Sequence, residues 1–413
     1  MVDAQPSGVN PGTASPQPEG HSRAQDGRHV VVIGGGVIGL AVAWRAALAG
    51  LAVTVADDQP AEGASLAAAG MLCPVTEAHF GEEALLALNL ASAARWPAFA
   101  AELEAASGQP VGYRAEGTLA VAFDEDDLRL LDGLHRYQVE LGLPGERLRS
   151  RQCRQLEPYL SPRIRGGILV RADHQVDTRA VTAALVAAGE RAGVRLVRQR
   201  VAEVLTGGGR VTGVRLAGDP GDTPGPPGGT ELGAGAVVLA AGCWSAEVPG
   251  LPSGCLPPVR PVKGQILRLQ GPADPPVLTR TVRGLHHGRS VYVVPRASGR
   301  IVVGATVEEK GFDTSVTAGA VRELLEDAIE LVPALGELEL VEALARLRPG
   351  SPDNAPLIGP AGIDGLVVAT GHYRNGILLT PVTADAVVEV LQTGEVPEVV
   401  APFSPQRFRE CEG

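Results

Sequence analysis

Three glycines near the start of the chain have the spacing of a dinucleotide-binding turn. Gly34, Gly36 and Gly39 form the pattern G-x-G-x-x-G. The first glycine permits a tight turn, the second lets the backbone approach a pyrophosphate, and the third lets a helix pack closely on a strand. The first N–H groups of that helix, at Val37 and Ile38, then bind phosphate. A chance glycine-rich turn is the alternative, because the chain contains 53 glycines.

Two features after this turn bear on which dinucleotide is bound. Asp57 lies close to the ~20 positions after the first glycine at which a ribose-binding carboxylate is expected, and Asp58 follows it. The run from Gly63 to Met71 then consists of small residues, which let backbone come close to a flat, extended ligand. An ordinary alanine-rich helix is the other interpretation of this run. On these residues alone NAD and FAD both remain open, with FAD slightly favoured.

Composition excludes several other classes of protein. The formal net charge of −11 argues against nucleic acid as a partner, because phosphate binding needs a basic face. No stretch reaches the uninterrupted apolar length of a membrane span. The five cysteines are scattered and not at metal-ligand spacings, so we expect no disulfide framework, no metal site and a cytoplasmic location. A secretory signal ending at residues 41–43 is a weaker alternative, because glycines interrupt its apolar run.

The first ordered elements form a βαβ unit. Residues 29–33 are a continuous apolar run, as expected for a parallel strand buried on both faces. The glycine turn and a helix over residues 40–49 follow, and Gly50 suits the end of that helix. Residues 53–56 are the second strand. Residues 1–28 are polar and rich in Pro, Gly and Ser, which predicts a disordered tail.

The remaining pattern predicts an α/β fold whose nucleotide domain is discontinuous. Parallel-type strands occur early, in the middle and late, with antiparallel material between them. We expect the first domain to comprise residues 29–80, 150–258 and 340–413, and a second, mixed antiparallel-sheet domain to comprise residues 81–149 and 259–339. Further elements are predicted as helices over 82–106 (broken at Pro97), 124–141, 179–192, 318–332 and 377–391, strands over 118–123, 194–204, 236–240, 265–269, 290–294, 300–304 and 365–370, and a loop over 207–230.

At this point the sequence resembles the D-amino-acid oxidase superfamily, and within it the bacterial glycine oxidases of thiamine biosynthesis. The resemblance extends from residue 30 to about residue 400. The segments that carry it are 32–39, 65–72, 237–245, 261–265, 292–296, 304–306, 347–350 and 371–379. It implies that the first domain is a Rossmann-like FAD-binding domain and that the second binds substrate.

The resemblance also implies the residues that hold FAD without a covalent bond. To the residues of the first turn it adds Val201, whose backbone is expected near the adenine, and the turn 372–378. This turn begins a late helix, and the dipole of that helix is expected to face the flavin N1–C2=O edge. In relatives that bind FAD covalently, the linking cysteine lies near the loop that carries the substrate-binding arginine. Residues 256–410 of this chain contain no cysteine, so we expect no covalent bond there. The full set of expected cofactor residues is Gly34, Gly36, Val37, Ile38, Gly39, Asp57, Asp58, Ala64, Ser65, Ala69, Gly70, Met71, Val201, Gly242, His372, Tyr373, Arg374, Asn375, Gly376, Ile377 and Leu378.

Four residues are expected to act on the substrate. Arg348 is the candidate for its carboxylate, because a guanidinium binds a carboxylate bidentately and keeps its charge. Tyr292 can add a hydroxyl donor, Arg374 lies in the loop beside the flavin, and Met71 lies under the ring. A solvated surface charge is the alternative for each arginine, and an ordinary core aromatic for Tyr292. Ser290 and Val307 replace a histidine and a methionine of the glycine oxidase pattern, both expected beside the substrate.

The expected reaction is oxidation of glycine or a similar small amino acid. The resemblance implies hydride transfer from the substrate Cα to flavin N5, with a neutral amine and no side-chain base. The imine then hydrolyses to an oxo acid and ammonia, or passes to thiazole synthase, and O2 is reduced to H2O2. Family members are often homotetramers. The alternatives are a D-amino-acid, proline or sarcosine dehydrogenase that reduces a quinone or carrier, and a non-catalytic nucleotide-binding protein.

Overall fold

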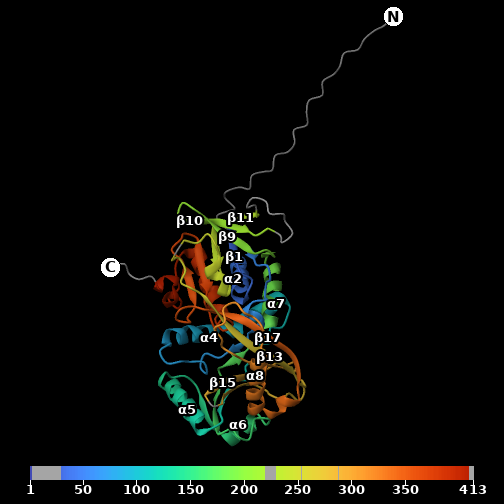
Figure 1. Ribbon diagram of the computed structural model, residues 1–413. Helices are drawn as coiled ribbons and strands as arrows, with labels where there is room; N and C mark the ends of the chain where they lie inside the picture. Colours follow the sequence, from blue (N-terminus) through green and yellow to red (C-terminus); the bar gives the residue numbers. More distant parts are fainter. Residues whose placement is uncertain (2–28, 219–228, 253, 287, 409–413) are drawn as a thin grey trace.

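The computed structural model describes Met1 and residues 29–218, 229–252, 254–286 and 288–408. Within them the chain builds one sheet of six strands and another of eight, which lie at opposite ends of an elongated molecule (Figure 1). The tail predicted over residues 1–28 falls, apart from Met1, outside the described residues. No helix of the described part is long and apolar enough to cross a membrane.

The six-stranded sheet is built on the predicted βαβ unit. Its strand order is β18-β19-β12-β1-β2-β8, and every pair is parallel except β18 with β19. The apolar run that resembled a secretory signal forms β1 and the start of helix α2 inside this domain. The strands are β1 (His29–Ile33), β2 (Ala52–Ala56), β8 (Arg195–Val197), β12 (Ala236–Leu239), β18 (Leu357–Pro360) and β19 (Leu366–Thr370).

The two faces of this sheet are covered differently. Helices pack on one face, where Val32 and Val238 join their apolar side chains in one core. A three-stranded sheet packs on the other face, where Val31 and Leu239 meet its valines. The helices are α2 (Val37–Leu48), α4 (Glu83–Ser107), α7 (Thr178–Arg191) and α9 (Thr380–Thr393), and the small sheet is β9 (Val201–Gly207), β10 (Arg210–Leu216) and β11 (Glu231–Gly233).

Helix α4 corrects the prediction of a break at Pro97. It runs continuously past this residue. A proline inside a helix costs ~3 kcal/mol, because it removes one hydrogen bond and crowds the preceding turn. Trp96 and Phe99 on either side are at most 1% exposed and pack edge-on at 5.3 Å, so burial offsets that cost.

The eight-stranded sheet is antiparallel except where β14 pairs with β4. Helix α8 covers one face, where Leu324 and Leu331 enter the core. In order across the sheet, the strands are β17 (Glu339–Gly350), β13 (Arg260–Gln270), β16 (Arg300–Gly304), β15 (Arg289–Pro295), β14 (Thr281–His286), β4 (Thr118–Ala122), β6 (Gly166–Val170) and β5 (Glu146–Arg149). The remaining strands and α-helices of the described residues are α3 (Ala64–Ala67), β3 (Met71–Leu72), α5 (Glu125–Glu140), α6 (Ser150–Leu156), β7 (His174–Gln175) and α8 (Ala318–Leu331).

Two predicted segments need correction. The single strand expected over residues 194–204 is two strands, β8 and β9, in different sheets. The loop expected over residues 207–230 contains strand β10, although residues 219–228 of it lie outside the described part. In β10 the buried Val211, Val214 and Leu216 supply an apolar face that the many glycines and prolines around them obscured.

Sheet membership also differs from the predicted division into domains. Strands β6 and β17 fall in segments expected to belong to the FAD-binding domain, yet both pair within the eight-stranded sheet. Strand β17 enters that sheet at Glu339, and Gly350 at its other end forms a β-bridge with His372, just after β19 of the six-stranded sheet. The division itself stays a prediction, but β17 is continuous between the two regions that frame the site.

Candidate active site

A cavity of about 480 Å³ lies at the carboxyl ends of four parallel strands of the six-stranded sheet. Its walls include residues at or just after the ends of β1, β2, β12 and β19, together with residues of β13, β15 and β17. Ligands of open α/β sheets bind in this type of crevice, outside the carboxyl ends of the strands. Gly34 from the first turn and His372 from the late turn, which are far apart in sequence, line the same cavity.

The glycine turn has the close approaches that its pattern predicts. Gly34 has φ of +107°, and a Cβ there would lie 2.4 Å from the carbonyl oxygen of Ala240. A Cβ on Gly39 would lie 2.0 Å from the carbonyl oxygen of Gly34, so the helix packs tightly on the turn. A Cβ on Gly36 would have Ser65 Oγ as its nearest neighbour, at 3.7 Å, so the backbone is open there. Helix α2 begins at Val37, whose N–H donates to Ser65 Oγ at 3.0 Å.

The carboxylate of Asp57 closes the turn from the end of β2. Its Oδ2 accepts the N–H of Gly35 at 2.5 Å, and its Oδ1 accepts the N–H of Gln59 at 2.7 Å. Burial raises the pKa of Asp57, against the lowering effect of these two backbone N–H groups. Each carboxylate oxygen has a second lone pair, so the group can still accept a ligand hydroxyl.

Arg348 and Tyr292 line the same cavity, and two glycines make room for them. A Cβ on Gly264 would lie 2.3 Å from Arg348 Nη1, and one on Gly304 would lie 2.3 Å from the Tyr292 hydroxyl. Arg348 Nη1 donates to the carbonyl oxygens of Thr306 at 3.1 Å and Lys263 at 3.4 Å, which fixes the side chain. Burial raises the pKa of the Tyr292 hydroxyl, although the charge of Arg348 acts to lower it.

A charged pair that the sequence analysis missed lies beside Tyr292. Glu77 lines the cavity, and its Oε1 is 2.5 Å from Nη1 of Arg283, which is the cross-strand partner of Tyr292. Burial alone would raise the pKa of Glu77, but Arg283 outweighs it and the pKa is lowered. His79 lies two residues after Glu77. Its Nε2 accepts a hydrogen bond from the exposed Arg374 at 3.0 Å. The available signal was the pair of ionisable residues Glu77 and His79, six and eight positions after Met71, where the run of small residues ends.

Comparison with protein families shows which family this chain belongs to. The model of the family described as FAD dependent oxidoreductase matches residues 29–390. The chain belongs to this family.

Several members of the FAD dependent oxidoreductase family are similar over most of the chain. The glycine oxidase of Geobacillus kaustophilus is 34% identical over 92% of this chain and 96% of its own length. A crystal structure of glycine oxidase from the same organism has a TM-score of 0.82 at 33% identity, covering 92% of this chain and 99% of that one. The bifunctional protein ThiO/ThiG of Trichormus variabilis is 34% identical over 93% of this chain, which spans only 55% of that relative. The chain is therefore similar to glycine oxidases over most of its length, and it spans about half the length of the bifunctional relative.

The residues present fit the FAD that this family uses. The open backbone at Gly36 and the positive end of the α2 dipole suit a pyrophosphate, and Ser65 Oγ, which accepts the Val37 N–H, lies beside the same turn. Asp57 remains able to accept a ribose hydroxyl, and Val201 adds an apolar side chain to the lining. Ile266 and the small-residue run line the other side of the cavity, where a flat ring needs close backbone.

Most of the expected site residues line this cavity, and three do not. Gly39 packs against the glycine turn, and the Asn375 N–H donates to the His372 carbonyl at 2.9 Å. The Leu378 carbonyl accepts hydrogen bonds from Ser92 and Trp96 of α4. The residues that line the cavity are Gly34, Gly36, Val37, Ile38, Asp57, Asp58, Ala64, Ser65, Ala69, Gly70, Met71, Val201, Gly242, Tyr292, Arg348, His372, Tyr373, Arg374, Gly376 and Ile377.

Three other placements differ from expectation. Ser290 and Val307, expected to flank the substrate, are exposed and lie outside the cavity lining, with Val307 60% exposed. The helix expected from Ile377 begins at Thr380, after a turn in which the Leu379 N–H donates to the Asn375 carbonyl at 2.8 Å. The two bonds from α4 to Leu378 hold this turn in place, so α9 can start only after it.

Proposed function

We propose that the protein oxidises glycine or a similarly small amino acid at the carbon next to nitrogen, with O2 as the electron acceptor. The observation that carries the proposal is the placement of Arg348 on β17 and Tyr292 on β15 of the eight-stranded sheet, in the same cavity as the glycine turn. A fixed guanidinium next to a hydroxyl donor suits an α-carboxylate. The similarity to glycine oxidases supports glycine as the substrate.

In the proposed mechanism the chain binds and orients the substrate. Arg348 has Nη1 committed to backbone carbonyls, so Nε and Nη2 are the atoms that would meet the carboxylate. Tyr292 stays protonated because its pKa is raised, and it would donate to the same carboxylate. Bound FAD supplies the acceptor for a hydride from the substrate carbon. No side chain acts as a base, because a substrate amine that enters neutral has the lone pair needed to form the imine.

Products and pathway belong to the same proposal. The imine hydrolyses to an oxo acid and ammonia, and two electrons reduce O2 to H2O2. We include a role in thiamine thiazole synthesis, with hand-off to thiazole synthase, on the strength of the resemblance to glycine oxidases of that pathway. A homotetramer stays a prediction from the family.

Anaerobic mixing with a panel of compounds tests the proposal. Glycine, sarcosine and small D-amino acids should bleach the flavin absorbance, whereas glycolate, the hydroxy acid matched to glycine, should not. Readmitted air should then restore the colour with one H2O2 per turnover. Bleaching by no amine would refute the substrate class. Bleaching followed by slow reoxidation in air but fast reoxidation by a quinone or dye would replace the oxidase with a dehydrogenase.

A further inference from the structure

Arg296 is a buried arginine to which the proposed reaction gives no role. It follows strand β15, four residues after Tyr292, and is 5% exposed. Burial lowers the pKa of its guanidinium to about 10. Its nearest carboxylate oxygen among the described residues, Asp177 Oδ2, is 3.8 Å from Nε. Burying a charge so weakly paired is costly, so the guanidinium needs a reason to be there.

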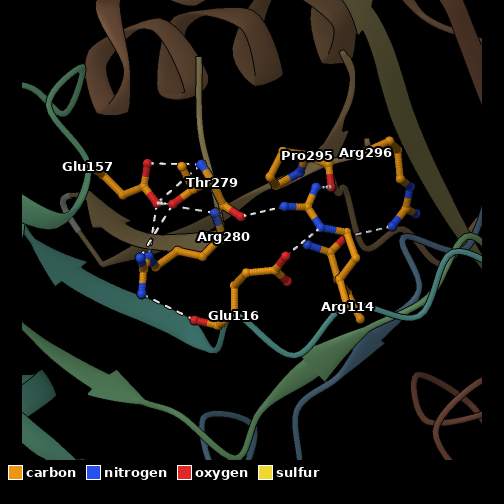
Figure 2. Close-up of polar contacts among 8 residues, drawn as sticks. Arg114, Glu116, Glu157, Thr279, Arg280, Pro295 and Arg296 are labelled. Carbon is orange, nitrogen blue, oxygen red and sulfur yellow. Dashed lines mark hydrogen bonds and ion pairs between the residues drawn. The ribbon is translucent and has the colours of Figure 1, made fainter. Parts of the chain in front are cut away.

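One hydrogen bond of Arg296 goes to the segment that lines the cofactor cavity, and the other goes to a residue that pairs with that segment. Nη2 donates to the carbonyl oxygen of Ala69 at 2.6 Å, and Nη1 donates to Oε1 of Gln175 at 2.8 Å. Ala69 lines the cavity, and Gln175 is the β-bridge partner of Met71, which lines it too. Figure 2 shows Arg296 next to Pro295, whose carbonyl accepts a hydrogen bond from the Arg114 side chain, and the Arg114 backbone pairs with that of Gln175.

The neighbouring carbonyls of the same run are also held from outside the cavity. A second buried arginine, Arg268 of β13, donates from Nη2 to the Leu66 carbonyl at 2.8 Å. The Thr178 hydroxyl donates to the Ala68 carbonyl at 3.0 Å. The Val176 N–H donates to the Gly70 carbonyl at 2.8 Å. The run is thus fastened at several successive carbonyls, while its residues face the cavity.

Strand β15 links this fastening to the substrate side of the site. Tyr292, Val294 and Arg296 alternate along the strand and share one face. Val294 packs with Ala67 and Ala69 in one buried cluster, against which Tyr292 also packs. The strand that carries Tyr292 therefore also contacts and hydrogen-bonds residues 66–71, which line the cofactor cavity.

We propose that Arg296, assisted by Arg268, is a positioning residue. It holds the backbone of residues 66–71 in contact with FAD and fixes the position of this segment relative to Tyr292. The planar guanidinium can donate to Ala69 and Gln175 at the same time, whereas a lysine ammonium is a point charge without that fork. The inference goes beyond the proposed reaction and holds whichever amino acid is the substrate.

Release of FAD from the holoenzyme tests it, because free FAD fluoresces. Loss of a charge-assisted hydrogen bond should speed FAD release by about 10- to 100-fold in Arg296→Met, and affinity changes appear mostly in dissociation rates. Arg296→Lys should lie between Arg296→Met and the parent. Amide hydrogen exchange at residues 69–71 should rise in both variants, and the visible flavin spectrum should shift.

Arg114→Met is the matched control. The Arg114 side chain donates to the carbonyls of Pro295 and Thr279 and to no carbonyl of residues 66–71 (Figure 2). The substitution keeps the backbone pairing of residue 114 with Gln175. Arg114→Met should lower thermal stability with little change in the rate of FAD release. Equal acceleration in both variants, or full restoration by Arg296→Lys, would overturn the proposal. If Arg296→Met fails to fold, Arg296→Lys and Arg268→Lys decide by the same readouts. Since no substrate is used, a failed bleaching experiment leaves this result interpretable.

Discussion

Replacement of Arg348 by methionine should weaken substrate binding while FAD stays bound. Methionine keeps much of the volume and removes the charge. Each hydrogen bond to a charged group contributes about 1.5–3 kcal/mol. Nη1 already donates to two backbone carbonyls, and the side chain is half-buried, so we count one charged hydrogen bond at the upper end of this range, about 3 kcal/mol. That corresponds to a loss of about 150-fold in kcat/KM.

The loss should fall on KM rather than on kcat, because the carboxylate contact is the same in the ground and transition states. Anaerobic bleaching at increasing glycine concentration separates the two, since it yields an apparent Kd and a limiting rate. Arg348→Lys keeps the charge without the fork and should lose about tenfold. Arg322→Met, on the exposed face of α8, is the control for a lost arginine. A KM within about threefold of the parent in Arg348→Met would refute the placement of the carboxylate.

Three further outcomes follow from the charges around the cavity. Glu77→Gln should lower the free energy of unfolding by about 2 kcal/mol in urea titrations, because the half-buried Arg283 loses its charged partner; an unchanged midpoint would contradict the pair's importance. The pKa of Asp173 is raised by burial to about 6, above its unfolded value, so its share of stability should be lost as pH rises from about 4 to 6, and Asp173→Asn should remove that slope in melts across this range. Burial lowers the pKa of His372 to about 3, so stability should fall as pH drops below about 6.5, and His372→Gln should flatten this opposite slope; an identical profile in the variant would exclude the group as its source.

The elements that local pattern predicts well are those that the cavity depends on first. Gly34, Gly36 and Asp57 lie within one βαβ unit, so their geometry follows from spacing alone. Arg348 and Tyr292 required a family resemblance, because nothing near them in sequence marks them as partners. The pair of Glu77 and Arg283 escaped both routes, since 206 positions separate them and only the sheet brings them together.

The misjudged elements fail for reasons of tertiary packing. Proline argued for a break in α4, and the burial of Trp96 and Phe99 overrode it. Glycine and proline content hid β10, whose valines find a partner only on the six-stranded sheet. Ser290 and Val307 show the opposite error. The glycine oxidase pattern predicted both beside the substrate, but both lie at the exposed surface.

The strand order of the six-stranded sheet also bears on how the protein is made. Strand β12 lies between β1, near the start of the chain, and β19, near its end. During synthesis the ribosome must therefore release most of the polypeptide before β12 gains its second neighbour, and until then an apolar strand edge stays open to other chains. We expect nascent molecules to depend on chaperones. A product that stops before Leu357 should be insoluble however well its nucleotide turn is formed.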